Sequence, residues 1–203
     1  MSSPSQPPAG EPPTATPRRA PGPTFTSDPA ADAWLVGKAR NGDTAAYEAL
    51  VRRHRVRVYR IALRMLGNHE DAEDVAQDTF VQVWSALAGF VGGAQFTTWL
   101  YRIVINRCIN HKRRRPPPVP LRDEDYPAGS GPEDAVVAEH RARATAAAIA
   151  ALPPDQRTVL VLHQMEGLTY QEVADILKLP EPTVRGRLAR ARRTLITDLR
   201  DWA

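Results

Sequence analysis

The chain has 203 residues, of which 42% are hydrophobic and 25% charged, and its formal net charge is +4. These values are ordinary for a soluble globular protein of one or two domains, and no run approaches the roughly 18 consecutive apolar residues of a membrane span. Cys108, the single cysteine, excludes an intramolecular disulfide and a cysteine-based zinc site and favours the reducing cytoplasm.

A Pro-rich tail is predicted at residues 1–29. Nine of the 19 prolines fall there, and large apolar side chains are almost absent. Such a segment cannot bury enough surface to fold, so we expect disorder and assign the tail no function. Its polar start, without a charged and then apolar run, predicts no targeting signal.

A first helical domain is predicted at residues 30–115, where apolar residues recur at spacings of three and four. It contains the acidic stretch "NHEDAEDVAQDTFVQVW". The side chains predicted to take the buried face of this helix are Ala72, Ala76, Phe80, Val83 and Leu87. No His or Cys falls at ligand spacing beside the acids, which disfavours a metal site. A solvated acidic face and a docking surface for a basic partner remain as interpretations.

The same domain ends in an aromatic and basic block, "FTTWLYRIVINRCINHKRRR", with six Lys or Arg side chains after three aromatic ones. Aromatic rings can stack on unpaired bases while cations hold phosphates, which favours single-stranded nucleic acid. The spacing of Trp99 and Ile103 is equally typical of core positions, so both interpretations stay open. Cys108 is interpreted as a packing residue.

A flexible linker is predicted at residues 116–134, because Pro and Gly interrupt every regular pattern there and acidic residues predominate. Helical periodicity returns in a second domain at residues 135–203. The fold class is therefore predicted to be all-α, with two small helical domains joined by this linker.

The second domain contains a predicted helix-turn-helix. Thr169 and Glu172 have capping-box spacing at the start of the first helix, and Pro180 lies in the turn that follows. In the second helix the apolar positions Val184, Leu188, Ala191 and Leu195 form one stripe. Arg185, Arg190 and Arg193 project away from it with two small residues, Gly186 and Ala189, which would let the backbone approach DNA closely. A solvated basic helix is the alternative.

Four motifs in order carry a family resemblance: "DAEDVAQDTFVQVW", "FTTWLYRIVIN", "ALPPDQRTVLVLHQMEGLTYQEVADIL" and "EPTVRGRLARARRTL". Together they resemble the extracytoplasmic-function (ECF) group of bacterial RNA polymerase sigma factors, over roughly residues 32–200. The resemblance implies a cytoplasmic protein that is not an enzyme, needs no cofactor or metal, and does not insert into membranes. It also implies three partners: core RNA polymerase, promoter DNA and an anti-sigma factor.

The resemblance implies a role for three sets of residues. The set that docks on core polymerase is Asp74, Gln77, Asp78 and Trp84. The set that opens and reads the minus-10 promoter element is Trp99, Tyr101, Arg102, Asn106, Lys112, Arg113, Arg114 and Arg115. The set for the minus-35 element is Thr183, Arg185, Arg187 and Arg190, and the outward position of Arg193 adds it to that set.

One position departs from the family pattern, which usually has Ser where this chain has Gly186. Glycine costs a helix interior about 0.5 to 1 kcal/mol relative to alanine and removes a hydroxyl that could reach a phosphate. The sequence therefore does not determine which promoter sequence the helix prefers at the contact made by position 186. The alternative function is a helix-turn-helix repressor, which would leave the aromatic and basic block unused.

Overall fold

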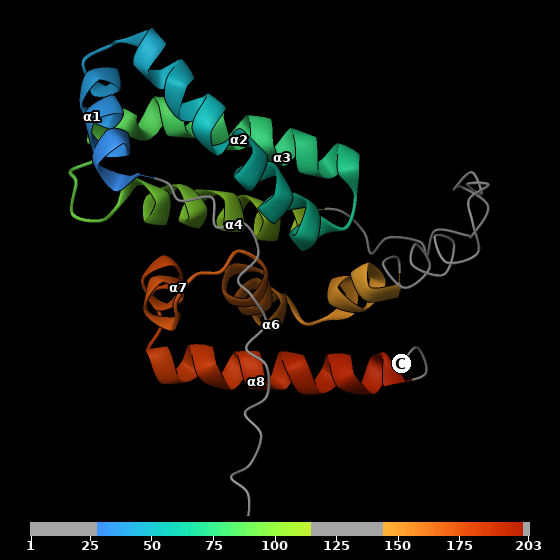
Figure 1. Cartoon of the computed structure of the whole chain (residues 1–203). Helices are drawn as coiled ribbons and strands as arrows, with labels where there is room; N and C mark the ends of the chain where they lie inside the picture. Colours follow the sequence, from blue (N-terminus) through green and yellow to red (C-terminus); the bar gives the residue numbers. More distant parts are fainter. Residues whose placement is uncertain (1–27, 115–143, 201–203) are drawn as a thin grey trace, which may run out of the picture.

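The computed structural model describes residues 28–114 and 144–200, called here the first half and the second half (Figure 1). The predicted linker, nearly all of the predicted tail, and Arg115 lie outside the described residues. The domain boundaries therefore stay predictions. Every regular element in the two described ranges is helical, which confirms the all-α fold class.

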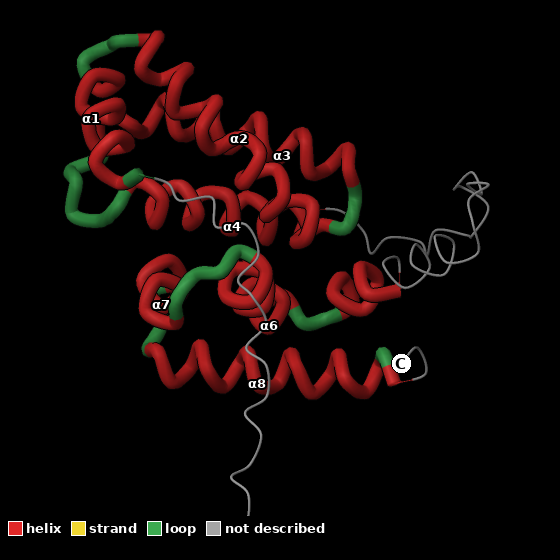
Figure 2. The backbone as a smooth tube through the Cα atoms, viewed as in Figure 1, coloured by secondary structure: helices red, strands yellow, loops and turns green. Residues whose placement is uncertain are grey.

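The first half contains four α-helices joined by short loops (Figure 2). Their bounds are α1 Pro29–Arg40, α2 Thr44–Leu66, α3 His69–Ala86 and α4 Phe96–Arg114, with a 3-10 turn η1 at Leu87–Gly89. Polar caps fix where three of them begin. Asp28, Asp43 and Asn68 each accept a hydrogen bond from a backbone N–H in the first turn of α1, α2 and α3. Gly67 ends α2 in the left-handed conformation at φ 78°, which glycine adopts without strain.

The second half begins in a helical segment at residues 144–151. It continues as α6 Pro154–Val159, a π-helical segment η3 Leu160–Met165, α7 Tyr170–Leu177 and α8 Glu181–Asp198. The predicted capping box at the start of α7 is confirmed, because Thr169 and Glu172 each accept a hydrogen bond from the other's backbone N–H. Lys178 then turns the chain at φ 54°, and α8 follows three residues later.

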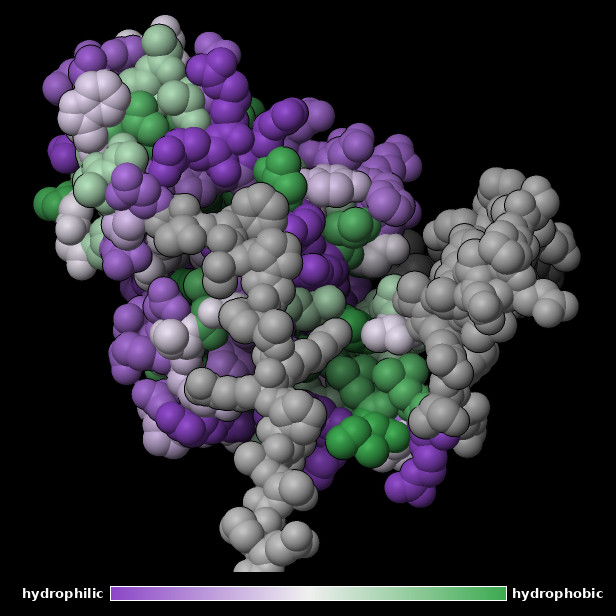
Figure 3. All heavy atoms as spheres, in the orientation of Figure 1, coloured by the Kyte–Doolittle hydropathy of each residue, from purple (hydrophilic) through white to green (hydrophobic). Residues whose placement is uncertain are grey.

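Each half buries apolar side chains between its own helices. Val58, Ile61 and Val83 are fully buried in the first half, and Val159 and Val173 are fully buried in the second. Burial of a large aliphatic side chain contributes about 1.5 to 3 kcal/mol. Hydrophilic side chains cover much of the surface in Figure 3, whereas hydrophobic ones gather beside the C-terminal part of α8, where Ile196 is exposed.

The two halves also lie against one another. Helix α4 contacts α7, and the C-terminal part of α2 contacts α6 and η3 (Figure 1). Helix α8 lies on the side of the second half that faces away from the first half. This arrangement leaves α8 open to solvent and brings α4 into contact with the second half.

Candidate nucleic-acid and partner interfaces

The carboxylates of α3 divide between the surface and the interior. Glu70, Glu73, Asp74 and Asp78 are exposed, whereas Asp71 is buried and its Oδ1 lies 3.1 Å from Nε2 of His111 on α4. No group of three His, Cys, Asp or Glu side chains in residues 28–114 and 144–200 could hold a metal ion. The acidic face of α3 is thus a solvent-facing surface with one acid turned inward.

The four residues expected to bind polymerase lie along α3. Asp74 and Gln77 are exposed, and Trp84 is 41% exposed. Asp78 is also exposed, but its Oδ2 accepts a hydrogen bond of 2.7 Å from Nη1 of Arg107 on α4. Because Arg107 already neutralises Asp78, Asp74 offers a partner the more available negative charge.

The buried face of α3 differs from the sequence prediction at four positions. Val75 and Thr79 take inward positions next to Ala72 and Val83, and Ala76 and Phe80 are only partly buried. Thr79 satisfies its buried hydroxyl by donating a hydrogen bond of 2.7 Å to the carbonyl of Val75. The sequence prediction included neither Val75 nor Thr79, and this local bond is what makes threonine acceptable in the interior.

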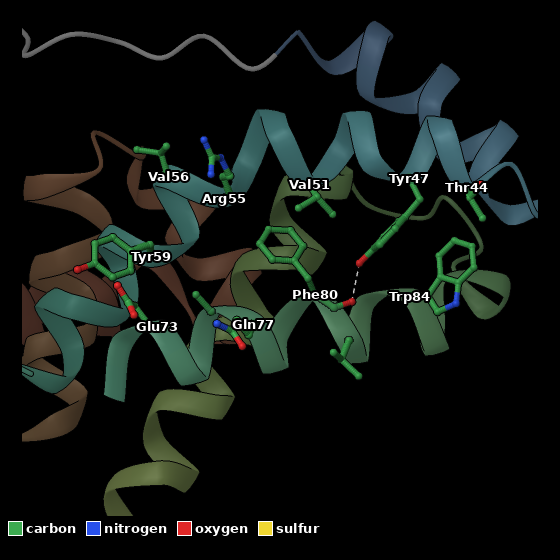
Figure 4. A pocket seen from close by; sticks show the side chains of 12 residues that line it. Thr44, Tyr47, Val51, Arg55, Val56, Tyr59, Glu73, Gln77, Phe80 and Trp84 are labelled. Carbon is green, nitrogen blue, oxygen red and sulfur yellow. Dashed lines mark hydrogen bonds between the residues drawn. The ribbon is translucent and has the colours of Figure 1, made fainter. Parts of the chain in front are cut away.

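Ala76 and Phe80 instead line a groove of about 1100 Å³ between α2 and α3 (Figure 4). Tyr47, Val51 and Tyr59 of α2 form the opposite wall, and Trp84 lies at one end. The hydroxyl of Tyr47 donates to the carbonyl of Phe80, and the rings of Tyr47 and Trp84 have centroids 4.7 Å apart. Burial raises the pKa of Tyr47 to about 12.

The sequence patterns did not predict this groove. The sequence feature that could have indicated the groove is a second apolar row on α2, formed by Tyr47, Val51 and Tyr59. It runs beside the core row that includes Leu50, Val58 and Ile61. Exposed apolar surface next to polar residues marks a site for a partner rather than a packed interior. Glu73 and Gln77 stand at its edge, so the groove and the acidic face of α3 are continuous.

The aromatic residues of α4 are mostly part of the interior. Trp99 is partly buried, with ring centroids 5.0 Å from Phe90 and 6.0 Å from Phe96. Tyr101 is 1% exposed, its ring lies under the Arg57 guanidinium at 5.1 Å, and burial raises its pKa to about 12. The Tyr101 ring is therefore not free to stack on a base in this conformation, and the Trp99 ring is partly covered by Phe90 and Phe96.

The polar residues of α4 differ in access. Asn106, Arg113 and Arg114 are exposed. Lys112 is partly buried, and burial, together with the nearby charge of Arg157, lowers its pKa. Arg102 donates hydrogen bonds of 3.0 and 2.7 Å to the carbonyls of Ile176 and Asp175, at the C-terminal end of α7.

The predicted stripe of α8 is confirmed. Val184, Leu188 and Ala191 are buried, and Leu195 packs partly buried against the same core. The opposite face exposes Arg185, Arg190 and Arg193, with Ala189 exposed and Gly186 half-buried among them. A side chain at position 186 would have room, since an added Cβ would meet only the Nη1 of Arg190 at 3.8 Å.

Neighbouring side chains orient the arginines at the start of α8. The Arg185 guanidinium pairs with Glu181 one turn earlier and lies 4.2 Å from the ring centroid of Tyr170. Arg187 lies 3.3 Å from Asp155 of α6, and Thr183 is half-buried. Arg185 therefore has a fixed position at the N-terminal end of the helix, while Arg190 and Arg193 extend from an exposed surface.

Among residues 28–114 and 144–200, none of the helices combines the length and the apolar composition of a membrane span.

Comparisons with protein families match both halves. The family model described as sigma-70 region 2 matches residues 50–116, and the one described as sigma-70, region 4 matches residues 142–195. The RNA polymerase sigma-H factor of Pseudomonas aeruginosa is 35% identical over 176 residues, which cover 81% of this chain and 91% of that protein. The ECF RNA polymerase sigma factor SigW of Bacillus subtilis is 33% identical over 179 residues, covering 82% and 95%.

Solved structures have the same architecture. CnrH, solved in complex with the cytosolic domain of CnrY, is 31% identical with a TM-score of 0.67, covering 84% of this chain and 98% of that chain. The sigma factor RpoE of Bartonella quintana, solved with the anti-sigma factor NepR, has a TM-score of 0.60 and covers 76% and 96%. Its identity is 23%, so that likeness concerns the fold alone.

Proposed function

The chain belongs to the ECF group of bacterial RNA polymerase sigma factors, which act in transcription initiation, and we propose that separate helix faces serve its separate partners. Sigma factors bind core RNA polymerase and promoter DNA. The observation that carries the assignment is the exposed arginine face of α8, backed by a buried apolar stripe and held by a capped α7. That is the form of a helix that enters the major groove.

We assign the minus-35 element to α8 through Thr183, Arg185, Arg187, Arg190 and Arg193. Arg185, near the N-terminal end of the helix, is suited to reading base edges, because recognition helices contact bases with their N-terminal residues. Arg193 lies two turns further along the helix and is suited to bind a backbone phosphate. Such a contact positions the helix on DNA without reading the base sequence.

We assign the minus-10 element to α4. Asn106, Arg113 and Arg114 are accessible for it as the structure stands, and Arg115 follows them outside the described residues. Trp99, Tyr101, Arg102 and Lys112 belong to the same assignment but are wholly or partly covered. Participation of Arg102 requires a change in the contact between the two halves, because it is bonded to α7, whereas Trp99 packs against Phe90 and Phe96 within the first half.

We assign core polymerase to the exposed face of α3 and the groove beside it. Asp74, Gln77 and Asp78 supply polar and negative groups, and Trp84 supplies an exposed ring at the end of the groove. Aromatic anchors beside a polar rim are typical of protein interfaces. A basic, partly apolar surface is the complement that this arrangement would bind.

We infer that an anti-sigma factor is a further partner, because the similar structures were solved as complexes with CnrY and with the anti-sigma factor NepR. We further infer that the chain acts in the cytoplasm and catalyses no reaction of its own. A helix-turn-helix repressor is the rival interpretation, and it would use only the second half.

The test is transcription in a purified system of bacterial core polymerase and a promoter-bearing template. Addition of the chain should produce transcripts from a defined start, whereas a repressor would only remove transcripts. Asp74→Arg should reduce both these transcripts and co-purification with core polymerase, because it reverses an exposed charge. Its binding to a minus-35 duplex should be unchanged, which controls for folding. No promoter-specific transcript with any template bearing promoters of this sigma group would contradict the proposal.

A further inference from the structure

Two side chains hold the guanidinium group of Arg185 on α8. Glu181, one turn earlier on the same helix, accepts a hydrogen bond of 2.8 Å from Nε of Arg185 at its Oε1, and the same oxygen accepts a second one from Nη2. The guanidinium carbon also lies 4.2 Å from the ring centroid of Tyr170, the first residue of α7. Arg185 is exposed, so these contacts orient a side chain that would otherwise be free to rotate in solvent.

A second ring fixes Tyr170 in turn. The imidazole of His163 in η3 stacks on the Tyr170 ring, with centroids 4.1 Å apart and an interplanar angle of 20°. His163 is itself held, because its Nδ1 lies 2.7 Å from the carbonyl oxygen of Leu168. A carbonyl only accepts, so Nδ1 carries the hydrogen of this bond. His163 and Arg185 are both too close to the ring centre to share one face of it, so Tyr170 lies between them.

The pair with Glu181 leaves one edge of the Arg185 guanidinium group able to donate. An arginine carries one N–H donor on Nε and two on each terminal nitrogen. Glu181 takes the Nε donor and one of the two on Nη2. The edge between Nη1 and Nη2 can still donate two parallel hydrogen bonds. Guanine accepts such a pair at O6 and N7 in the major groove of DNA.

We propose that Tyr170 is a positioning residue for the minus-35 element and that Glu181 determines its specificity, because together they present the remaining edge of Arg185 to one guanine. The proposal rests on the assignment of the minus-35 element to α8. An arginine without such partners satisfies its charge on any phosphate within reach, which adds affinity without reading sequence. Glu181 supplies that counter-charge from within the protein. The pair therefore gives up sequence-independent affinity and gains discrimination between bases.

The first measurement locates the guanine. A minus-35 duplex is selected by the full chain from a randomised library, and each guanine in it is replaced in turn by 7-deazaguanine, which pairs normally but lacks the N7 acceptor. One replacement should weaken binding by the parent chain roughly fivefold or more, and should have little effect on Arg185→Ala, which has lost the donors. If no replacement distinguishes the two proteins, Arg185 reads no guanine and the proposal is overturned.

The second measurement tests Tyr170 at that guanine. Tyr170→Leu should reduce the loss caused by 7-deazaguanine roughly two- to fivefold, because the cation no longer lies over a ring. Tyr170→Phe keeps the ring and should behave as the parent chain. In an Arg185→Ala background, Tyr170→Leu should change nothing at that guanine. A merely structural role would weaken binding to every duplex alike, so unchanged sensitivity at the guanine in Tyr170→Leu would overturn the positioning role.

The third measurement leaves the aromatic rings intact, should Tyr170→Leu not fold. Glu181→Gln removes the counter-charge of Arg185 and keeps the size of the side chain. It should bind a scrambled duplex roughly three- to tenfold more tightly, with a steeper salt dependence, while the selected duplex gains less. Glu48→Gln is the matched control, since it removes the same charge from another pair at spacing i,i+4, with Arg52 on α2. Equal affinity ratios of selected to scrambled duplex in the two variants would overturn the role of Glu181.

Failure of this proposal is distinguishable from failure of the proposed function. If the full chain selects no duplex from the library, the assignment of the minus-35 element to α8 is contradicted and this proposal falls with it. If the chain selects a duplex that Tyr170→Leu and Glu181→Gln discriminate as well as the parent chain does, the assignment of α8 stands and only the roles of these two residues are refuted.

Discussion

Helices α4 and α8 are both rich in arginine and both assigned to DNA binding, yet the residues of this assignment are exposed to different extents on the two helices. Helix α8 lies on the side of the second half that faces away from the first (Figure 1), and its Arg185, Arg190 and Arg193 are exposed. On α4, Arg102 is hydrogen-bonded to α7 and Tyr101 is buried. A basic sequence predicts affinity for DNA at both helices, but in the structure α4 exposes Asn106, Arg113 and Arg114 while it covers other residues of the same assignment. Access to Arg102 depends on how the halves are arranged.

The largest effect is expected at the inward face of α8. Leu188 is 1% exposed, so Leu188→Ala should lower the free energy of unfolding by about 2 to 5 kcal/mol, through lost burial and a cavity. The matched outward change, Arg190→Ala, should alter stability by less than about 0.5 kcal/mol while weakening DNA binding. Urea unfolding followed by circular dichroism measures both. Similar losses for the two variants would contradict the division of α8 into two faces.

The next effect separates base reading from phosphate binding on α8. Arg185→Ala should reduce discrimination between matched and scrambled minus-35 duplexes by about 1 to 3 kcal/mol. Arg193→Ala should weaken both duplexes alike and reduce the salt dependence of binding. Titrations of both duplexes at several salt concentrations distinguish the two outcomes. Equal effects of both variants on both duplexes would refute the assignment.

On α4, the pH dependence of stability should reveal the burial of Tyr101. Its pKa is raised from 10.0 to about 12 in the folded chain, so its contribution to stability is complete below pH 10 and is lost as the pH rises through 12. Tyr101→Phe should therefore flatten the fall in stability over that window, by about 1.4 kcal/mol for each pH unit between the unfolded and folded pKa values.

Tyr47→Phe is the control variant, because burial raises the pKa of Tyr47 to about 12 as well. Tyr47 donates a hydrogen bond to Phe80, whereas the Tyr101 hydroxyl has no partner among the described residues. At neutral pH, Tyr47→Phe should thus cost about 1 kcal/mol and Tyr101→Phe should cost little. Chemical unfolding at pH 7 and between pH 10 and 12 makes the comparison. An unchanged alkaline slope in Tyr101→Phe would show that this ring is not buried in solution.

The smallest effect is expected for Gly186→Ser on α8. The added atoms have room, and serine has the higher helix propensity, so stability should rise by about 0.5 kcal/mol. Thermal unfolding would detect this as a higher midpoint. A lower midpoint would mean that the backbone at Gly186 needs glycine for a reason other than space. Promoter titrations with the same protein would show whether the hydroxyl adds a phosphate contact.

Sequence patterns predicted the features that depend only on residues close together along one helix. The stripe of α8, the capping box of Thr169 and Glu172, and the exposure of Asp74 all follow from spacings of three or four residues. They did not predict the groove, because it exists only where α2 and α3 lie side by side. Nor did they predict the ion pair of the buried Glu166 with Arg57, because the two residues are 109 positions apart along the chain.

The difference in access between α4 and α8 can be measured with two oligonucleotides on one protein, the free full-length chain. A minus-35 duplex and a minus-10 single strand are titrated separately, first without and then with saturating core polymerase. We predict that the free chain binds the minus-35 duplex through α8 but binds the minus-10 strand only weakly, and that the polymerase complex binds both. Equally tight binding of both oligonucleotides by the free chain would contradict this division between the two helices.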